Sequence, residues 1–291
     1  MAANTTAVTV SYSEGGVTKT TTTPVTVTSI SNTLASNSWA TIRAVSDAGK
    51  GSNYWSVGDA KGITINGKVG ATTISNLAIS VFILGFNHNA SREGSNRIHF
   101  QIGKINGTLV GLVDGNYGSY TSTTGAFTMN TSNTNSGGGN NSHMRKTVLG
   151  SNSTSATSPT ANTLLAALPA DLRAVMKPAT KYSDNTGGGS DTASYVTSTT
   201  DLLPLLSEFE YHGARSYANS AEKNYQAQYD YYKAGNSKVH YKHNATGTAA
   251  YAWCRSVYSS NSSDFCLVGT DGSAINHYAY GSWALAPCFF V

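Results

Sequence analysis

The sequence predicts an α+β protein in which a small β-rich segment, residues 1–35, precedes one larger domain, residues 36–291. Near the N-terminus, Val and Ile alternate with Thr and Ser, and this period of two is typical of strands. From residue 54 onward, apolar strand-like runs are mixed with short helical patterns. A length of 291 residues suits one large domain with a small appendage, and no internal repeat is visible.

We expect the N-terminal segment to form a β-hairpin within residues 7–30. Its strands would contain Val8-Thr9-Val10 and the run from Val25 to Ile30, and its turn would lie at Glu14-Gly15-Gly16. A two-stranded ribbon is only marginally stable alone in water. The segment is therefore predicted to pack on another protomer or on a larger assembly, as an anchoring and oligomerisation element.

A helix is predicted in residues 31–48. Trp39, Ile42 and Val45 recur at a helical spacing, and Ala35 and Ala48 extend the same pattern with little apolar area. The two glycines that follow, at 49 and 51, would end the helix.

The next part of the chain predicts strands joined by turns and loops. Asn66-Gly67 is a dipeptide typical of tight hairpin turns. The apolar run Ile74–Phe86 and the alternating run Ile98–Ile102 are predicted as strands. The Thr/Ser/Asn/Gly stretch of residues 121–141 is predicted as a loop.

Shorter elements are predicted farther along. Two short helices are expected within Leu164–Met176, divided at Pro169, which suits the first turn of the second helix. Residues 183–200 are predicted as a polar loop. The apolar run Leu202–Leu206 carries Pro204, which argues against a central strand.

A final helix is predicted from Asn219, because Glu222 three positions later resembles a capping box. Three tyrosines would share one face of this helix, and Gly235 would end it; they are Tyr225, Tyr229 and Tyr232. The last residues, Pro287–Val291, are of buried type, so the C-terminus is expected to be a strand held in a sheet.

The composition argues against some classes of binding partner. Only 12% of residues are charged, and the formal net charge of +4 is spread without a run of Lys or Arg, so we expect no nucleic-acid binding. The longest apolar stretch, Leu77–Phe86, is too short to cross a bilayer, so no membrane insertion is expected. The first residues, Met1–Thr6, lack a secretory signal. A polar, non-ionic surface without that signal fits a virion protein released by cell lysis, and also a shortened chain.

Candidate catalytic and metal sites are weak. Cys254, Cys266 and Cys288 are expected as buried free thiols, with one disulfide among them left open. A Cys/His dyad with His277 has little support, and no nucleophile elbow or phosphate-binding Gly-Lys-Ser/Thr motif is present. We therefore predict that the protein is not an enzyme and has no cofactor and no metal ion.

Other polar groups are interpreted as structural. Asp184-Asn185-Thr186-Gly187 and Asp191 could supply oxygen ligands to calcium, but the EF-hand spacing is absent and a solvated loop is favoured. The cluster His88, Arg92 and Glu93 is interpreted as a hydrogen-bonded loop clamp. Glu208, Glu210 and His212 are also interpreted as structural.

The best candidate binding residues form an aromatic and polar set near the C-terminus. Tyr provides a large rigid contact area, and Ser, Asn and His provide hydrogen bonds. The alternative is that these tyrosines complete a small core. The candidate residues are Tyr258, Ser259, Asn261, Asn276, His277, Tyr278, Tyr280 and Trp283.

From about Trp39 to its end, the chain resembles the C-type lectin-fold domains of bacteriophage and prophage surface proteins. These include the target proteins of diversity-generating retroelements and share their fold with formylglycine-generating enzymes. The motifs that carry the resemblance are Tyr54-Trp55-Ser56-Val57-Gly58-Asp59, Gly85-Phe86-Asn87-His88-Asn89, Ser142-His143-Met144-Arg145, Leu168-Pro169-Ala170-Asp171-Leu172, Leu205-Leu206-Ser207-Glu208-Phe209-Glu210 and Trp253-Cys254-Arg255-Ser256.

The chain departs from this family at its end. The family closes with Gly-Val-Arg-Pro-Ala-Phe, whereas this chain has Ala284-Leu285-Ala286-Pro287-Cys288-Phe289 and lacks the arginine. The reactive cysteine pair or copper site of the enzymatic branch also has no match among the three cysteines. The resemblance therefore implies a C-type lectin-like fold and display of a binding surface. In the retroelement targets, the variable residues lie in this same C-terminal region.

Together these observations predict a phage virion-surface protein of the tail-fibre or head-fibre type. Its C-terminal loops would bind a host-surface glycan or protein, and its N-terminal segment would contact other virion proteins, in a homo-oligomer. The first alternative is a structural virion decoration or tail component that binds no ligand. The second is an oxidase-like enzyme of the same fold.

Overall fold

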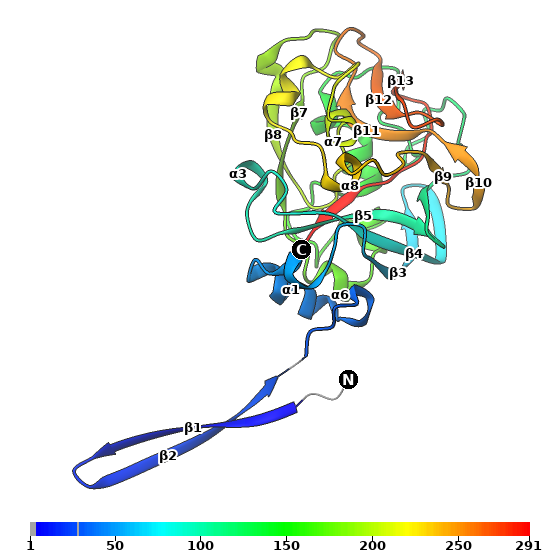
Figure 1. The fold of residues 1–291 in the computed structure, drawn as a ribbon. Helices are drawn as coiled ribbons and strands as arrows, with labels where there is room; N and C mark the ends of the chain where they lie inside the picture. The colour runs from blue at the N-terminus through cyan, green and yellow to red at the C-terminus, as the bar shows by residue number, and fades with distance from the viewer. Residues whose placement is uncertain (1–3, 28) are drawn as a thin grey trace.

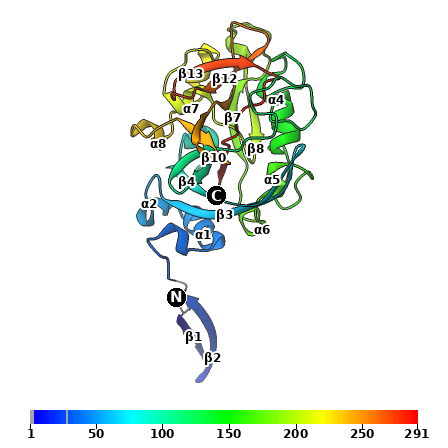
Figure 2. The ribbon, with the colours of Figure 1, turned by 90° about the vertical axis from the view of Figure 1, so that its right-hand side faces the viewer.

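The N-terminal segment forms a long antiparallel ribbon. The computed structural model describes residues 4–27 and 29–291, with the side chains of residues 9–22 and 29–291. Strand β1 (Asn4–Glu14) pairs with β2 (Val17–Val27) along its whole length. Gly15 and Gly16 form the two-residue turn with φ of 57° and 81°, the left-handed conformation that such hairpin turns need. The predicted hairpin is confirmed, and Figures 1 and 2 show it standing clear of the rest of the protein.

The chain enters the body through a short 3₁₀-helix, η1 (Leu34–Ser36), and the helix α1 (Trp39–Asp47). The predicted helix is confirmed only from residue 39, because Asn37 donates to the carbonyls of Ser31 and Thr33 and holds the preceding residues in a turn. Ser38 then caps the helix by accepting a hydrogen bond from the Thr41 amide. As predicted, α1 buries Trp39, Ile42 and Val45, and it is followed by α2 (Gly51–Tyr54).

A seven-stranded sheet is the main scaffold of the body. All its pairings are antiparallel except the one between β6 and β9. The last strand pairs with β5, so the expected C-terminal strand is confirmed. In spatial order the strands are β10 (Ala245–Ala250), β9 (His240–Lys242), β6 (Thr108–Gly111), β5 (Ile98–Ile105), β4 (Thr72–Phe86) and β3 (Ala60–Val69), with β14 (Cys288–Phe290) beside β5.

The prediction of a turn at Asn66-Gly67 is wrong. Both residues lie inside β3, where the pairing with β4 shifts between Ile65 and Gly67 and forms a β-bulge. The Asn66 side-chain oxygen accepts a hydrogen bond from the Asn76 amide and fixes this irregularity. The turn lies at Gly70-Ala71 instead.

A second hairpin overturns part of the polar loop predicted at 183–200. Strand β7 (Ala179–Asp184) pairs with β8 (Val196–Asp201), and only the residues between them form a loop and the short helix η3 (Ala193–Tyr195). Sequence patterns missed β7 because its buried side chains include Lys181 and Ser183, which are polar.

The helices of the body are short. The pair predicted within Leu164–Met176 is confirmed, with Pro169 just before the second helix. The helix predicted from Asn219 is wrong: it is one 3₁₀ segment that ends at Asn224, and the tyrosines that follow belong to separate segments. The remaining helical segments are α3 (Ala90–Glu93), α4 (Gly138–Asn141), η2 (Met144–Leu149), α5 (Leu164–Ala167), α6 (Ala170–Arg173), α7 (Glu208–His212), η4 (Ser220–Asn224) and α8 (Asp230–Lys233).

A separate three-stranded sheet carries the C-terminal candidate residues. Its order is β11 (Ala252–Val257), β12 (Asp264–Val268) and β13 (Ala274–Tyr278). Trp253 of β11 belongs to the largest hydrophobic core. This core continues to the main sheet, where the rings of Phe100 and Phe289 stack with centroids 5.2 Å apart. The body is thus a mixed α+β structure with several sheets.

No described helix is long and apolar enough to cross a membrane.

Candidate binding surface

Strand β13 lies at one edge of the three-stranded sheet, so its side chains are only partly covered. Residues 274–277 are half-buried, and Tyr278 is 43% exposed. The register pairs His277 with Phe265 and Tyr278 with Asp264. His277 therefore lies on the face of the sheet that covers the core, whereas Tyr278 and Asn276 lie on the other face.

Four aromatic side chains gather around the end of β13. Tyr120, which is 48% exposed, lies 5.1 Å from Tyr280, 5.5 Å from His277 and 5.8 Å from Tyr278, measured between ring centroids. We call these four residues the aromatic surface. Three of them belong to the predicted set, and Tyr120 comes from a loop more than 150 residues earlier in the chain.

Trp283 supports the aromatic surface from below. Its ring lies 4.6 Å from that of His277, and Tyr117 and Tyr251 contact it edge-on at 5.5 and 5.2 Å. Trp283 is only 6% exposed. Its indole Nε1 has no hydrogen-bond acceptor among the described residues. A Cβ atom at Gly281 would lie 2.6 Å from that nitrogen, so only glycine leaves room for the indole.

Backbone hydrogen bonds join the two loops that carry these rings. The Thr121 amide donates to the Tyr280 carbonyl at 2.9 Å, and the Ser282 amide donates to the Ser119 carbonyl at 2.9 Å. Asp114 lies beneath them: it accepts from the Ser282 hydroxyl at 2.6 Å and from the Phe127 amide at 2.8 Å. The rings are therefore presented on a fixed backbone, which lowers the entropy lost when a ligand binds.

The pKa values of two members of the aromatic surface are shifted chiefly by burial, and the carboxyl group of Asp264 contributes a smaller, raising effect to both. Burial lowers the pKa of His277 below its ordinary value, and burial together with Tyr280 and Tyr278 raises the pKa of Tyr120. The imidazole and the phenol are thus both neutral near pH 7. Such a surface suits hydrogen bonding and ring stacking with an uncharged ligand.

Three of the predicted residues lie in a separate loop. The Tyr258 ring packs edge-on against Tyr217 at 5.3 Å, and the Asn261 side chain accepts hydrogen bonds from the amide and hydroxyl of Ser263. Ser259, expected on the binding surface, is buried, and its hydroxyl donates to the Tyr217 carbonyl. The contacts of these three side chains stabilise the loop that carries them.

Asn135 fixes the position of this loop. Its buried side-chain nitrogen donates to the carbonyls of Asn261 at 2.6 Å and Asp264 at 2.9 Å. Its side-chain oxygen accepts from the Gly188 amide at 2.8 Å. One asparagine thus joins three loops that are distant in sequence.

The structure brings together part of the set that the sequence predicts as a binding surface. His277, Tyr278 and Tyr280 come together, and Asn276 is half-buried on the same face of the sheet as Tyr278. Trp283, expected as an exposed contact, is a buried support. Tyr120 was missed, although Asn116-Tyr117-Gly118-Ser119-Tyr120 has the same Tyr/Ser/Gly/Asn composition. That composition was the only signal in the sequence that could have identified Tyr120.

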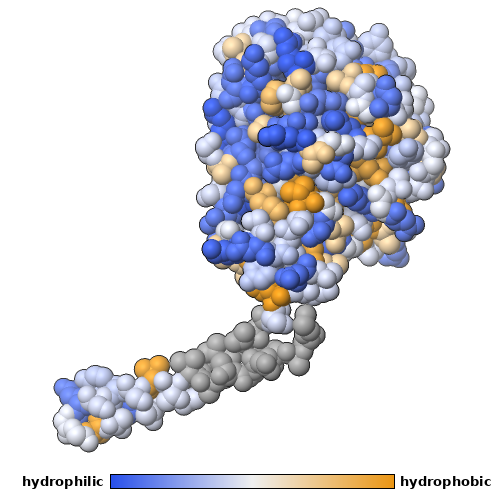
Figure 3. Space-filling view, in the orientation of Figure 1, coloured by the Kyte–Doolittle hydropathy of each residue, from blue (hydrophilic) through white to orange (hydrophobic). Residues whose placement is uncertain are grey.

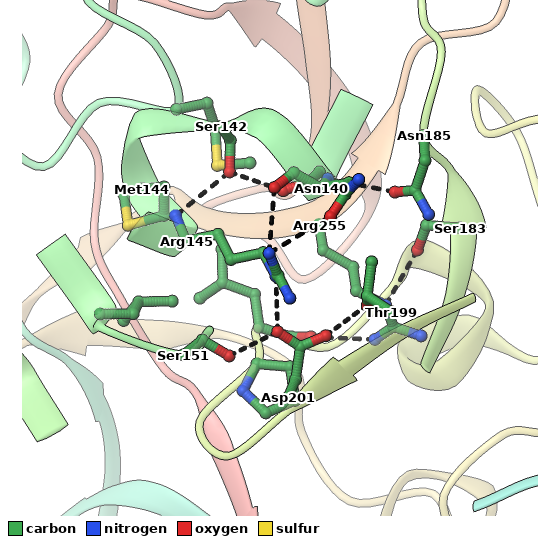
Figure 4. Close-up of a pocket in the computed structure, with 15 residues that line it drawn as sticks. Asn140, Ser142, Met144, Arg145, Ser151, Ser183, Asn185, Thr199, Asp201 and Arg255 are labelled. Atoms are coloured by element: carbon green, nitrogen blue, oxygen red, sulfur yellow. Dashed lines mark hydrogen bonds and ion pairs between the residues drawn. The ribbon is translucent and has the colours of Figure 1, made fainter. Parts of the chain in front are cut away.

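A cavity beside Arg145 and Asp201 is too small to bind an organic ligand. Its volume is about 20 Å³, which holds about one water molecule. Figure 4 shows the two side chains facing each other, with the Arg145 Nε 2.6 Å from an Asp201 oxygen. Ser151 donates to the same oxygen at 2.8 Å. We interpret this cavity as a packing defect within a structural network.

A buried ionic cluster lies between α3, β7, α7 and β11. Lys181 Nζ lies 2.6 Å from Glu93 and 2.8 Å from Glu210, and Arg255 donates to both oxygens of Glu210. Burial by itself raises the pKa of Glu210, but the charges of Arg255 and Lys181 outweigh it and lower the pKa. Burial lowers the pKa of the adjacent His88 to about 3. Two cations balance two carboxylates here.

This cluster does not fit a metal ion. Ligand atoms of His88, Glu93 and Glu210 lie within 4.8 Å of one another. The carboxylates already bind Lys181 and Arg255, and a cation added among those two charges would be repelled. Glu93 does clamp its loop as predicted, whereas Arg92 packs instead over the ring of Tyr225, 4.6 Å from its centre.

Other polar groups with candidate chemistry are also used by the fold. Asp184 accepts from the amides of Thr186 and Gly187 and so shapes the loop considered for calcium. Glu208 accepts from the amides of residues 216–218. The three cysteines are free and buried, so the disulfide left open does not form, and burial raises the pKa of Cys288 to about 12.

Comparison with known proteins gives one match. A family model described as "Domain of unknown function (DUF6273)" matches residues 160–291. The matched part runs from α5 to the C-terminus and includes the three-stranded sheet and the ionic residues Lys181, Glu210 and Arg255. Tyr120 and the ribbon lie outside it. No curated protein and no solved structure matches the chain.

Proposed function

We propose that the protein is displayed on a phage virion, as part of a tail or head fibre, and binds a host-surface glycan or protein through the aromatic surface. The observation that carries the proposal is the cluster of Tyr120, His277, Tyr278 and Tyr280 at a sheet edge. Exposed aromatic side chains held on a fixed backbone are typical anchors of recognition surfaces.

The chemistry of the surface favours an uncharged ligand, with a glycan first. Aromatic faces pack against the apolar faces of sugar rings, and the phenol, imidazole and Asn276 groups supply hydrogen-bond donors and acceptors. We further propose that the body has a C-type lectin-like fold. The ordered motifs of the sequence support this, as do the C-terminal strand in the main sheet and the small separate sheet that carries the aromatic surface.

A glycan array tests the proposal. Tyr278→Ala, Tyr280→Ala and Tyr120→Ala are each expected to lower affinity roughly tenfold, or about 1.4 kcal/mol, as truncation of a contact residue does. Tyr225→Ala is the matched control, because Tyr225 packs on Tyr182 and on Arg92 of α3, far from β13 in Figure 1. Binding that is unchanged in the three variants would remove the assigned surface.

The second candidate function is a structural virion component without a ligand. It is favoured by the same exposed tyrosines, because they could be buried against a neighbouring virion protein. Chemical labelling of Tyr120 and Tyr278 in intact particles separates the two functions. Labelling of both residues in the particle supports ligand binding, and protection of both supports the structural role.

A further inference from the structure

The two faces of the ribbon differ in chemistry. The register places Val10 opposite Thr21, Tyr12 opposite Lys19 and Glu14 opposite Val17 on one face. We call this the apolar face. The opposite face carries only hydroxyl side chains over the described length; they are Thr9, Ser11, Ser13, Thr18, Thr20 and Thr22.

The side chains of the opposite face, which we call the hydroxyl face, form some hydrogen bonds with one another. Thr9 and Thr22 lie 3.3 Å apart, and Ser13 and Thr18 lie 2.7 Å apart, measured between hydroxyl oxygens. On the apolar face, the Tyr12 hydroxyl donates to a Glu14 carboxylate oxygen at 2.7 Å, but the valine side chains can be satisfied only by apolar contact. Val10, Tyr12 and Val17 are 61%, 63% and 61% exposed, and they are three of the five large hydrophobic residues that are exposed in the described part of the chain.

The body does not cover this face. None of the described ribbon residues belongs to a hydrophobic core, and Figures 1 and 2 show the ribbon projecting away from the sheets. In Figure 3 the coloured part of the ribbon shows hydrophobic residues among paler and bluish ones. An isolated two-stranded ribbon is marginally stable in water, so an uncovered apolar face predicts a partner.

We propose that the partner is a second copy of this chain, whose ribbon packs its own apolar face against this one. The face carries one carboxylate, Glu14, and one ammonium, Lys19, close to the turn. An identical face therefore presents the complementary charges, and a symmetric pairing leaves no net charge between the ribbons. This proposal is independent of what the aromatic surface binds.

The size of the ribbon limits how tightly two copies associate. Eleven residues per strand at about 3.3 Å each give a face about 36 Å long and about 10 Å wide, or roughly 360 Å² per chain. A stable interface buries about 800 Å² per partner. In the proposed pair the remaining area would come from the body, where a groove of about 480 Å³ lies beside α1 and is lined by Ile30, Ala40, Ala44 and Tyr54.

Analytical ultracentrifugation of the full chain over a range of micromolar concentrations tests the proposal. The wild-type chain is expected to form a species of at least twice the 30.5 kDa mass of one chain. The double variant Val10→Lys/Tyr12→Lys, which places two charges on the apolar face, is expected to sediment as a single chain. The double variant Ser11→Lys/Ser13→Lys adds the same charge to the same strand on the hydroxyl face, and it is expected to associate as the wild type does.

Two results would overturn the proposal. The first is a wild-type chain that stays at the mass of one chain at every concentration, which would assign the apolar face to a different virion protein. The second is loss of association to the same extent in both double variants, which would mean that charge and not the apolar face controls it. Far-ultraviolet circular dichroism and the unfolding temperature, unchanged in all variants, separate either result from a failure of the body to fold.

Discussion

Lys181 joins three buried side chains in the interior of the body. It is 1% exposed and contacts Glu93, Glu210 and the hydroxyl of Tyr229 at 2.6, 2.8 and 3.0 Å. Such a cluster is costly to desolvate and adds little net stability, but loss of one member leaves a buried charge without its partner.

We predict that Lys181→Met lowers the free energy of unfolding by about 3 to 5 kcal/mol, because it leaves Glu93 without a cation. Urea denaturation measures this. Asp47→Ala is the control: it removes a half-exposed partner of Arg43 and Lys177, and a loss of about 1 kcal/mol or less is expected. A Lys181→Met protein as stable as the control would show that the cluster does not hold the fold together.

At the scale of single residues, the sequence showed which residue types gather near the C-terminus better than it showed which of them are exposed. The abundance of Tyr, Ser, Asn and His drew attention to His277, Tyr278 and Tyr280, whose rings are neighbours in the folded chain. It could not show that Ser259 is buried, because this residue stands in a polar stretch of the sequence. Trp283 is buried as well, and the apolar residues that follow it were a signal that the prediction did not use. It also could not place Tyr120 beside them, because that contact depends on the bridge between Tyr120 and Gly281, which forms only in the folded chain.

At the scale of elements, the segment that follows β13 is the connection between the fold and the aromatic surface. It brings Tyr280 to the surface, turns at Gly281 and places Trp283 underneath. The packing of the indole against Gly281 and His277 therefore determines how the exposed rings lie.

We predict that Gly281→Ala displaces the indole of Trp283, because the added Cβ would lie 2.6 Å from its Nε1. The expected results are a loss of about 1 to 3 kcal/mol in unfolding free energy, as overpacking typically costs, and a shift in tryptophan fluorescence. Glycan binding should weaken as well. Gly247→Ala is the control, since a Cβ there meets no atom within 4 Å. Identical fluorescence in the two variants would refute this support of the surface.

Elements with a regular apolar period were predicted correctly from the sequence, and elements stabilised by polar contacts were not. The ribbon, β4, β5 and the core of α1 follow from alternation, turn residues and helical spacing. Strand β7 was missed because Lys181 and Ser183 face inward to meet buried partners, which no local pattern shows. The Asn66-Gly67 bulge was mistaken for a turn because the dipeptide favours both.

At the scale of the whole molecule, histidine protonation links stability to pH. The pKa of every one of the seven histidines is lowered, chiefly by burial. For His88 it falls to about 3, and for His212 and His240 to about 4. As the pH falls below about 6.5, the unfolded chain therefore binds protons that the folded chain does not, and folding becomes less favourable.

We predict that the free energy of unfolding is highest near neutral pH and falls steadily from about pH 6.5 to pH 4. Glu222 and Glu93 oppose this trend, because burial raises the pKa of both carboxyl groups, that of Glu222 to about 7, but the seven histidines outnumber them. Urea denaturation at several pH values measures the slope. His240→Phe, which removes one buried titrating ring, should reduce the slope, and a stability that is flat or rises toward pH 4 would contradict the account.

The exposed large hydrophobic residues of the described chain lie at just two places. Val10, Tyr12 and Val17 are on the ribbon, and Tyr120 and Tyr278 are on the aromatic surface. In Figure 1 the ribbon and β13 lie at opposite ends of the molecule. One end therefore suits assembly with other copies, the other suits contact with a target, and several copies held together would raise the effective concentration of weak binding sites.

Co-sedimentation of the purified chain with a panel of bacterial cells tests the central claim most directly. The comparison is between the wild type, the double variant Tyr120→Ala/Tyr278→Ala and the control Tyr225→Ala, each first shown to unfold at the same temperature. The account predicts that the wild type and Tyr225→Ala sediment with the same cells and that the double variant stays in the supernatant. Equal sedimentation of the double variant would contradict it.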